Sequence, residues 1–189
     1  MIEFTGEMRL NGKAPKSFPR GSEVFGSLFD SALKAKQNVS KRIAERVAEL
    51  AKEVLEKQVY RSQWEDLSET YSDWKERQNL DPRTLISTGE YLDSIKARVR
   101  HYPTRYFVGP DPEATHKDSG LPFKKLMRMH EYGFEDPARG VRIPARPFWR
   151  PFAEEVRIWI EDEITTNFKL EVMANMKRDY PGGPWVKDI

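Results

Sequence analysis

Cysteine is absent from the 189 residues, which excludes disulfides, thiolate zinc sites and cysteine nucleophiles. Histidine occurs three times, as His101, His116 and His130, and none of them forms a metal-ligand pair at helical spacing. A glycine-rich phosphate loop and a G-x-S-x-G nucleophile motif are also missing. We therefore expect no catalytic residue, no metal site and no cofactor, although a site built from scattered carboxylates leaves no pattern in a sequence.

Long apolar runs are also lacking, since no stretch approaches the roughly 18 residues that a membrane-spanning helix needs. The first residues, MIEFTGEMRL, do not have the pattern of a secretion signal. The net charge is only +2, with 33% charged and 38% hydrophobic residues. The composition predicts a modest core and a densely charged surface. The lack of long apolar runs predicts a soluble, non-membrane protein, and the lack of cysteine suits a protein made in a reducing cytoplasm.

The first half of the chain changes from strand to helix periodicity. Alternating apolar residues predict a strand over 2–10, and glycine and proline predict a loop over 11–21. Apolar residues at steps of three to five predict a long amphipathic helix over 24–60, with a break near Gln37-Asn38 as an alternative. A polar connection and a short helix are expected over 61–80. Its aromatic and apolar side chains should face the body of the protein; they are Trp64, Leu67, Tyr71 and Trp74.

The middle of the chain predicts a helix followed by a hairpin. Ser87 and Glu90 have the spacing of a capping box, which would begin two helical turns over 85–95. The β-prone runs 96–102 and 105–109 surround Pro103-Thr104 and predict a β-hairpin. A polar loop is expected to follow over 110–121.

The last part of the chain predicts a helix, a strand and a second long helix. The helix should cover 123–132 and end at Gly133 in the left-handed conformation. We expect a loop over 134–140, a strand over 141–144 and a helix from 147 to about 173. The apolar stripe of this last helix consists of Phe152, Val156, Trp159, Ile160, Ile164 and Phe168.

This order of elements predicts an α+β fold with a small antiparallel sheet packed against two long helices. We expect an N-terminal strand and arm over 1–22, a single domain over 23–173 and a C-terminal tail over 174–189.

Charge is unevenly distributed. Residues 96–150 contain twelve Lys or Arg and six Asp or Glu, whereas 151–163 contain five acidic residues and one Arg. The basic region indicates a surface for nucleic acid, or for head-to-tail packing of identical subunits against the acidic region, or simply a mixed charged surface.

Three segments resemble a known family when they are taken in order. They are DPRTLISTGEYLDSI, then YFVGP, then MHEYGF followed by IPARPFWRPFAEE. Together they resemble the neck, tail-completion and tail-component proteins of tailed bacteriophages over about residues 81–155. Ser87 and Tyr91 depart from the arginine and leucine typical of that family, and the two termini lie outside the match. The matching motif residues are Ser87, Thr88, Gly89, His130, Glu131, Gly133, Ile143, Pro144, Arg146, Pro147 and Phe148.

The resemblance implies a non-enzymatic virion protein at the head–tail junction, in a six-fold ring of its own copies around the DNA channel. Head-tail connector and tail proteins would be its partners, with at most passive contact to DNA. Candidate contacts to other subunits or the channel are Arg98, Arg100, Arg142 and Arg150. The alternatives are a nucleic-acid-binding protein that uses the basic 96–150 region, and a metal-dependent hydrolase.

Overall fold

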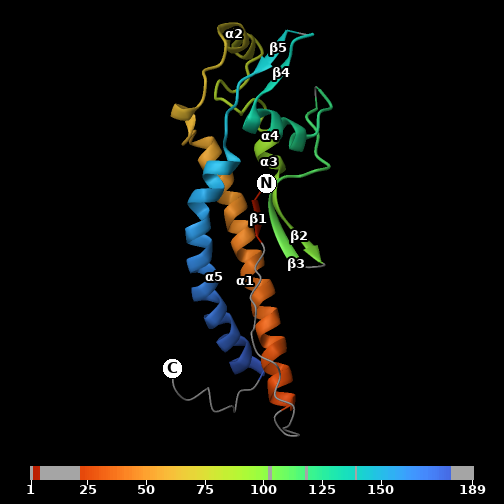
Figure 1. Ribbon diagram of the computed structural model, residues 1–189, viewed down its shortest axis with the longest axis vertical. Helices are drawn as coiled ribbons and strands as arrows, with labels where there is room; N and C mark the ends of the chain where they lie inside the picture. Colours follow the sequence, from red (N-terminus) through yellow and green to blue (C-terminus); the bar gives the residue numbers. More distant parts are fainter. Residues whose placement is uncertain (1, 5–21, 102–103, 118, 139, 180–189) are drawn as a thin grey trace. The chain divides into compact units, whose positions relative to one another are not determined.

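The protein has an α+β fold, as the sequence predicts, with helices and short antiparallel strands along one chain (Figure 1). The computed structural model describes residues 2–4, 22–101, 104–117, 119–138 and 140–179. The predicted loop over 11–21, most of the strand over 2–10 and the end of the tail lie outside the described residues.

Two long helices dominate the chain. α1 covers Ser22–Glu56 without the break considered near Gln37-Asn38, and it ends four residues before the predicted Tyr60. α5 covers Trp149–Asp179, so the predicted end near Met173 is too early. In α1 the residues at steps of three and four are buried, including Val39, Val47 and Leu55. The apolar period therefore identified the core-facing side of this helix correctly.

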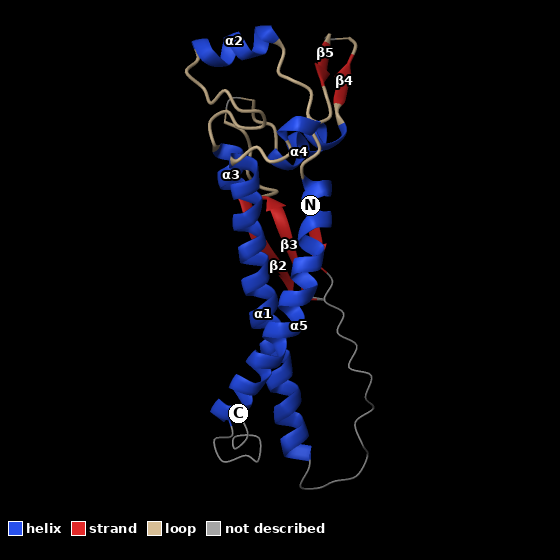
Figure 2. Ribbon diagram, turned by 90° about the vertical axis from the view of Figure 1, so that its left-hand side faces the viewer, coloured by secondary structure: helices blue, strands red, loops and turns tan. Residues whose placement is uncertain are grey.

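The main sheet has three antiparallel strands in the order β1-β3-β2. β2 (Ile95–His101) and β3 (Thr104–Pro110) form the predicted hairpin, in which Ile95 pairs with Pro110 and Ala97 with Val108 (Figure 2). β1 (Ile2–Phe4) pairs with the other edge of β3. Ile95 and Val108 are buried, whereas Val99 is exposed.

Three short helices lie on either side of the β2–β3 hairpin in the sequence, α2 and α3 before it and α4 after it. α2 covers Glu69–Arg77 and follows a 3-10 turn at Arg61–Gln63. α3 covers only Glu90–Ser94, because its last predicted residue, Ile95, already belongs to β2. α4 covers Phe123–Tyr132, as predicted.

The predicted capping box at Ser87 and Glu90 is wrong. α3 begins after Gly89, which has a φ of 82° and no side chain to cap the helix. The Glu90 carboxylate instead accepts a hydrogen bond from the backbone N–H of Lys117 and pairs with the Lys117 ammonium at 3.2 Å. A local spacing rule failed here because a residue from a distant loop competes for the carboxylate.

The interpretation of 134–140 as a loop is also wrong in part. β4 (Phe134–Asp136) pairs with β5 (Val141–Ile143) as a second antiparallel hairpin. Gly133 ends α4 with the expected positive φ, 77°, but its ψ of 165° is not that of the left-handed helix. This extended ψ turns the chain directly into β4, which is why the loop is shorter than predicted.

The aromatic side of α2 is oriented differently from the expectation. Trp64 is buried, but Tyr71 and Trp74 are 44% and 45% exposed and stack on each other at 5.4 Å. The buried side chain of α2 is Lys75, only 2% exposed. Helical spacing alone does not show that this short helix directs a lysine inward and two aromatics outward.

The described chain divides into two compact units, to which both long helices contribute. The first contains residues 2–4 and 44–157, with the sheets and the three short helices. The second contains residues 22–43 of α1 and 158–179 of α5. Its buried residues include Ala35, Val39 and Asn175, whose side-chain amide donates to the Ser31 carbonyl at 3.2 Å. An ion pair between Arg42 and Glu171, at 3.2 Å, adds a second tie within this unit.

Candidate functional site

The start of α5 is capped by a carboxylate from another helix. Glu131, on α4, is 6% exposed. It accepts hydrogen bonds from the backbone N–H groups of Phe148 and Trp149, each at 2.9 Å, and of Arg150 at 3.0 Å. The first N–H groups of a helix have no partner within that helix, and its N-terminus carries partial positive charge. Glu131 therefore satisfies three donors and ties α4 to α5.

Arg146 connects the segment before α5 to the chain before α2. Its guanidinium, in a side chain that is 5% exposed, donates from Nε to the Glu65 carbonyl at 3.1 Å and from Nη2 to the Asp66 carbonyl at 3.2 Å. Its backbone N–H donates to the His130 carbonyl at 2.6 Å. Burial lowers the pKa of Arg146 from its usual value, although neighbouring Glu65 acts in the opposite direction.

Lys75 organises the loop that follows α2. Its ammonium donates to the carbonyls of Asp81 and Arg83 at 2.7 Å and of Ile86 at 2.5 Å. An ammonium group has three donors, so these three carbonyls use all of them. Burial lowers the pKa of Lys75, because removal from water disfavours the charged form. The loop therefore folds around an internal cation.

Aromatic side chains complete the packing around the start of α5. Phe148 lies 5.4 Å from Phe152, 5.1 Å from Trp149 and 5.9 Å from Tyr60, measured between ring centroids. The indole N–H of Trp149 donates to the Tyr91 hydroxyl at 2.9 Å. Trp149 and Tyr91 thus pack their apolar rings in the protein while their polar atoms are hydrogen-bonded to each other.

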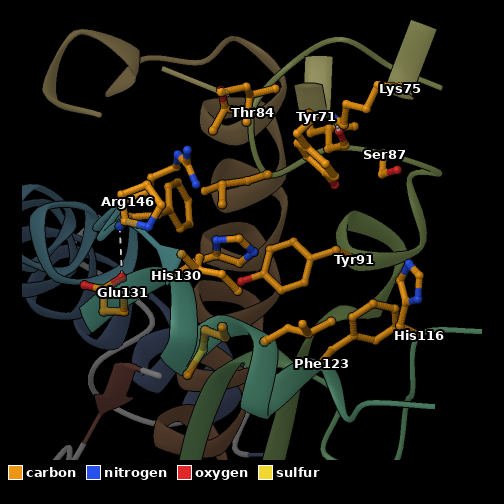
Figure 3. Close-up of a pocket in the computed structure, with 18 of the residues that line it drawn as sticks. Tyr71, Lys75, Thr84, Ser87, Tyr91, His116, Phe123, His130, Glu131 and Arg146 are labelled. Atoms are coloured by element: carbon orange, nitrogen blue, oxygen red, sulfur yellow. Dashed lines mark hydrogen bonds between the residues drawn. The ribbon is translucent and has the colours of Figure 1, made fainter. Parts of the chain in front are cut away.

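These elements enclose a pocket of about 710 Å³ in the first unit. Its walls come from α2, the loop before α3, α3, α4 and the segment before α5. Figure 3 shows how the labelled side chains, among them Tyr71, Tyr91 and His130, gather around it. The apolar part of the wall includes Ile86, Leu92, Phe123, Leu126 and Met127. The pocket therefore combines apolar walls with a few polar groups, as ligand sites do.

His130 is one of the titratable groups that this environment perturbs strongly. Burial, and next the positive charge of Arg146, lowers the pKa of His130 from 6.5 to about 4. Its Nδ1 atom is buried and has no hydrogen-bond partner among the described residues. His130 is therefore neutral at pH 7, and its unpartnered Nδ1 atom is closed to solvent.

The structure brings together nearly all the residues that carry the family resemblance. The motif residues that line the pocket are Ser87, Thr88, Gly89, His130, Glu131, Ile143, Pro144, Arg146 and Phe148. Gly133 ends α4, and Pro147 accepts the indole N–H of Trp64 on its carbonyl at 2.9 Å. Segments that are separated by about 40 residues of sequence thus form one constellation.

The four arginines predicted as contacts to other subunits have different surroundings. Arg98 is half-buried and donates to the Pro110 carbonyl at 2.9 Å. Arg142 is exposed and pairs with Glu65 at 3.4 Å and Glu135 at 3.6 Å. Arg150 is exposed, 4.0 Å from Glu131 and over the Tyr132 ring. The side chain of Arg100 lies outside the described residues.

Sequence reasoning missed Lys75, Tyr91 and Trp149 as members of this site. In the sequence, Lys75 is one of several charged residues of a polar helix, and only its burial in the structure distinguishes it from the others. Tyr91 and Trp149 were visible as aromatic residues at helix starts, but their hydrogen bond joins positions far apart in the sequence.

The described residues contain no group of three or more His, Asp or Glu side chains that could hold a metal ion. None of the described helices is long and apolar enough to span a membrane. Comparisons of the chain with models of known protein families, with curated proteins and with solved structures found no match.

Proposed function

We propose that this protein is a structural virion component of a tailed bacteriophage, acting at the head–tail junction as a subunit of a neck or tail-completion ring. The proposal starts from the three resembling segments. Its main structural support is their convergence around a single joint, where Glu131 caps α5 and Arg146 holds the chain before α2. A joint of this kind gives the subunit a fixed shape, which a ring of repeated contacts requires.

The surface charges also suit repeated head-to-tail contacts. Glu154, Glu161 and Asp162 are exposed on α5, whereas Arg142 and Arg150 are exposed before and at its start. When copies pack head to tail, basic groups of one copy can meet acidic groups of the next and fix the register.

The alternative, a nucleic-acid-binding surface over 96–150, receives less support. Arg98 and Arg146 donate to carbonyls of the chain itself, and Arg142 pairs with two carboxylates. Guanidinium groups with internal partners contribute less to phosphate binding than free ones do. Three basic residues of this region thus have structural roles.

The test is electron microscopy of lysates from the phage that carries the gene, after deletion of the gene. We expect DNA-filled heads beside free tails, because the ring that joins them is missing. Abnormally long or absent tails would assign the protein to tail termination or tail assembly. Joined, normal virions would overturn the proposal.

Complementation of the deletion then tests the contact residues. Arg142→Glu together with Arg150→Glu should leave heads and tails separate, because like charges would meet in the ring. Lys57→Glu, at an exposed lysine after α1, is the matched control and should restore joined virions. Equal rescue by both would show that these arginines do not contact another subunit.

A further inference from the structure

The pocket wall contains a buried cation, Arg146, whose side-chain hydrogen bonds all go to backbone carbonyls. Arg146 uses Nε and Nη2 for two backbone carbonyls, and its Nη1 has no hydrogen-bond partner among the described residues. Glu65 and Asp66, whose charges act on Arg146, form ion pairs with other cations. Glu65 pairs with Arg142 at 3.4 Å, and Asp66 pairs with Arg61. A guanidinium carries five N–H donors, so Arg146, which is 5% exposed, keeps three N–H groups without a hydrogen-bond partner among the described residues.

The other cation that is buried in the pocket wall is not available in the same way. All three N–H donors of Lys75 are occupied by carbonyls. The other arginine of the lining, Arg142, pairs with Glu65 and Glu135. The unused N–H donors of Arg146 are therefore the principal anion-binding group of the described pocket.

The remaining walls define what kind of anion fits. The other walls of the pocket include the apolar side chains of Leu92, Phe123 and Met127. Glu65 and Asp66 also line the pocket and oppose the entry of a multiply charged ligand. One negative charge on an apolar carrier matches this arrangement better than a phosphate does.

We propose that this pocket binds a carboxylate carried on an apolar group, with Arg146 as the charge partner and the Ile86, Leu92, Phe123, Leu126 and Met127 side chains around the carrier. A guanidinium binds a carboxylate by charge-assisted hydrogen bonds, which are stronger than neutral ones. The carboxylate can come from a free organic acid or from an acidic side chain of a second copy of the chain. The α5 segment at 158–165, IWIEDEIT, carries acidic and apolar residues together, with Ile158, Glu161 and Asp162 exposed. The inference does not depend on the proposed function.

The first experiment compares two probes on the purified full-length protein. Isothermal titration calorimetry measures the binding of 3-phenylpropionate and of the neutral 3-phenylpropionamide. We expect the carboxylate to bind at least about tenfold more tightly, the minimum that a charge-assisted hydrogen bond provides. Equal affinity for the two probes, or binding of neither, would overturn the proposal without any variant.

Variants then locate the binding. Arg146→Gln removes the charge and should abolish the preference for the carboxylate, whereas Arg128→Gln, at an exposed arginine of α4 outside the pocket wall, should leave it unchanged. Because Arg146 also holds two carbonyls, Leu126→Trp is the second variant; it fills the pocket and should weaken binding of both probes. Circular dichroism verifies that each variant is folded. Wild-type binding by the Leu126→Trp protein would contradict the assigned pocket.

A third arm identifies the source of the carboxylate. A synthetic peptide of residues 158–165 is titrated in competition with 3-phenylpropionate, beside the same peptide with its acidic residues replaced by amides. Competition by the acidic peptide alone would identify a second copy as the source. Binding of 3-phenylpropionate without competition from either peptide would identify a free organic acid.

Discussion

At the scale of single residues, buried charges in this protein are satisfied mainly by backbone groups. Glu131 accepts three N–H groups, Lys75 donates to three carbonyls and Arg146 donates to two. Backbone groups in loops and at helix starts lack regular partners, and hydrogen bonds to an ionised group are strong. Each buried charge therefore organises a part of the chain whose backbone groups lack the regular hydrogen bonds of a helix or sheet.

Replacement of Glu131 by glutamine should destabilise the protein. The amide keeps one acceptor oxygen but removes the negative charge and directs an N–H₂ group toward backbone donors. We expect a loss of about 1–3 kcal/mol in the free energy of unfolding, measured by urea denaturation. Glu135→Gln, at an exposed carboxylate that pairs with Arg142, is the control and should cost less than about 0.5 kcal/mol. Equal effects would contradict the capping role of Glu131.

His130 should make stability depend on pH. Its pKa in the folded protein, about 4, is below the usual 6.5, so folding favours the neutral ring. The contribution of neutral His130 to the free energy of unfolding is complete above pH 6.5. It is lost as the pH falls from 6.5 to about 4, because in this range the unfolded chain binds a proton at His130 and the folded protein does not. Between pH 7 and 4.5, wild-type protein should lose about 2–3 kcal/mol more unfolding free energy than His130→Gln. A constant difference between the two proteins across this range would contradict a buried neutral His130.

At the scale of elements, distant partners determine several boundaries. α5 begins where Glu131 accepts hydrogen bonds from its first N–H groups, and α3 begins at Glu90, after Gly89, although the spacing of Ser87 and Glu90 suggests an earlier cap. The β4–β5 hairpin starts immediately after α4 because Gly133 adopts a φ of 77° with an extended ψ. This conformation is available almost only to glycine.

Substitution of Gly133 by alanine should therefore cost more than the same change at Gly140. Both glycines have a positive φ, 77° and 63°. A Cβ at Gly133 would lie 3.3 Å from the Ala145 nitrogen and from the Ile143 carbonyl oxygen, whereas a Cβ at Gly140 would meet open space. We expect Gly133→Ala to lose about 1–3 kcal/mol more in unfolding free energy than Gly140→Ala, as measured by urea denaturation. Equal losses would mean that the β4–β5 segment can move away from the new methyl group.

At the scale of the whole molecule, two units with different cores share the same two helices. The first unit contains buried aromatic residues, including Tyr60, Phe148 and Phe152. The buried residues described in the second unit include no aromatic side chain; they are Ser31, Ala35, Val39, Ile43, Ile160 and Asn175. Burial of less apolar area gives less stabilisation, so the two units should differ in local stability.

Hydrogen exchange should show this difference within single helices. We expect backbone amides at 31–43 and 160–175 to exchange faster than amides at 44–56 and 152–157, in the same α1 and α5. Mass spectrometry of deuterium uptake at neutral pH measures both sets in one sample. Uniform protection along each helix would show that the two units open together.

Much of the fold followed from local patterns, whereas the site did not. The hairpin at 96–109, the helix at 123–132 and the buried stripe with Val39 and Val47 were predicted, because period and turn chemistry are local properties. Lys75 and Tyr91 were missed as site residues, since their roles depend on groups that other elements bring to them.

The sequence by itself determined the α+β class, the two amphipathic helices and the exclusion of thiol chemistry, because these depend only on residue type and spacing. Only the tertiary structure decided that α2 buries a lysine and exposes two aromatic rings. It also decided that Glu131, on α4, caps the start of α5. It also brought the segments around Ser87, His130 and Arg146 to one pocket. The physical reason is that burial and hydrogen-bond pairing depend on long-range packing, which residue spacing along the chain does not encode.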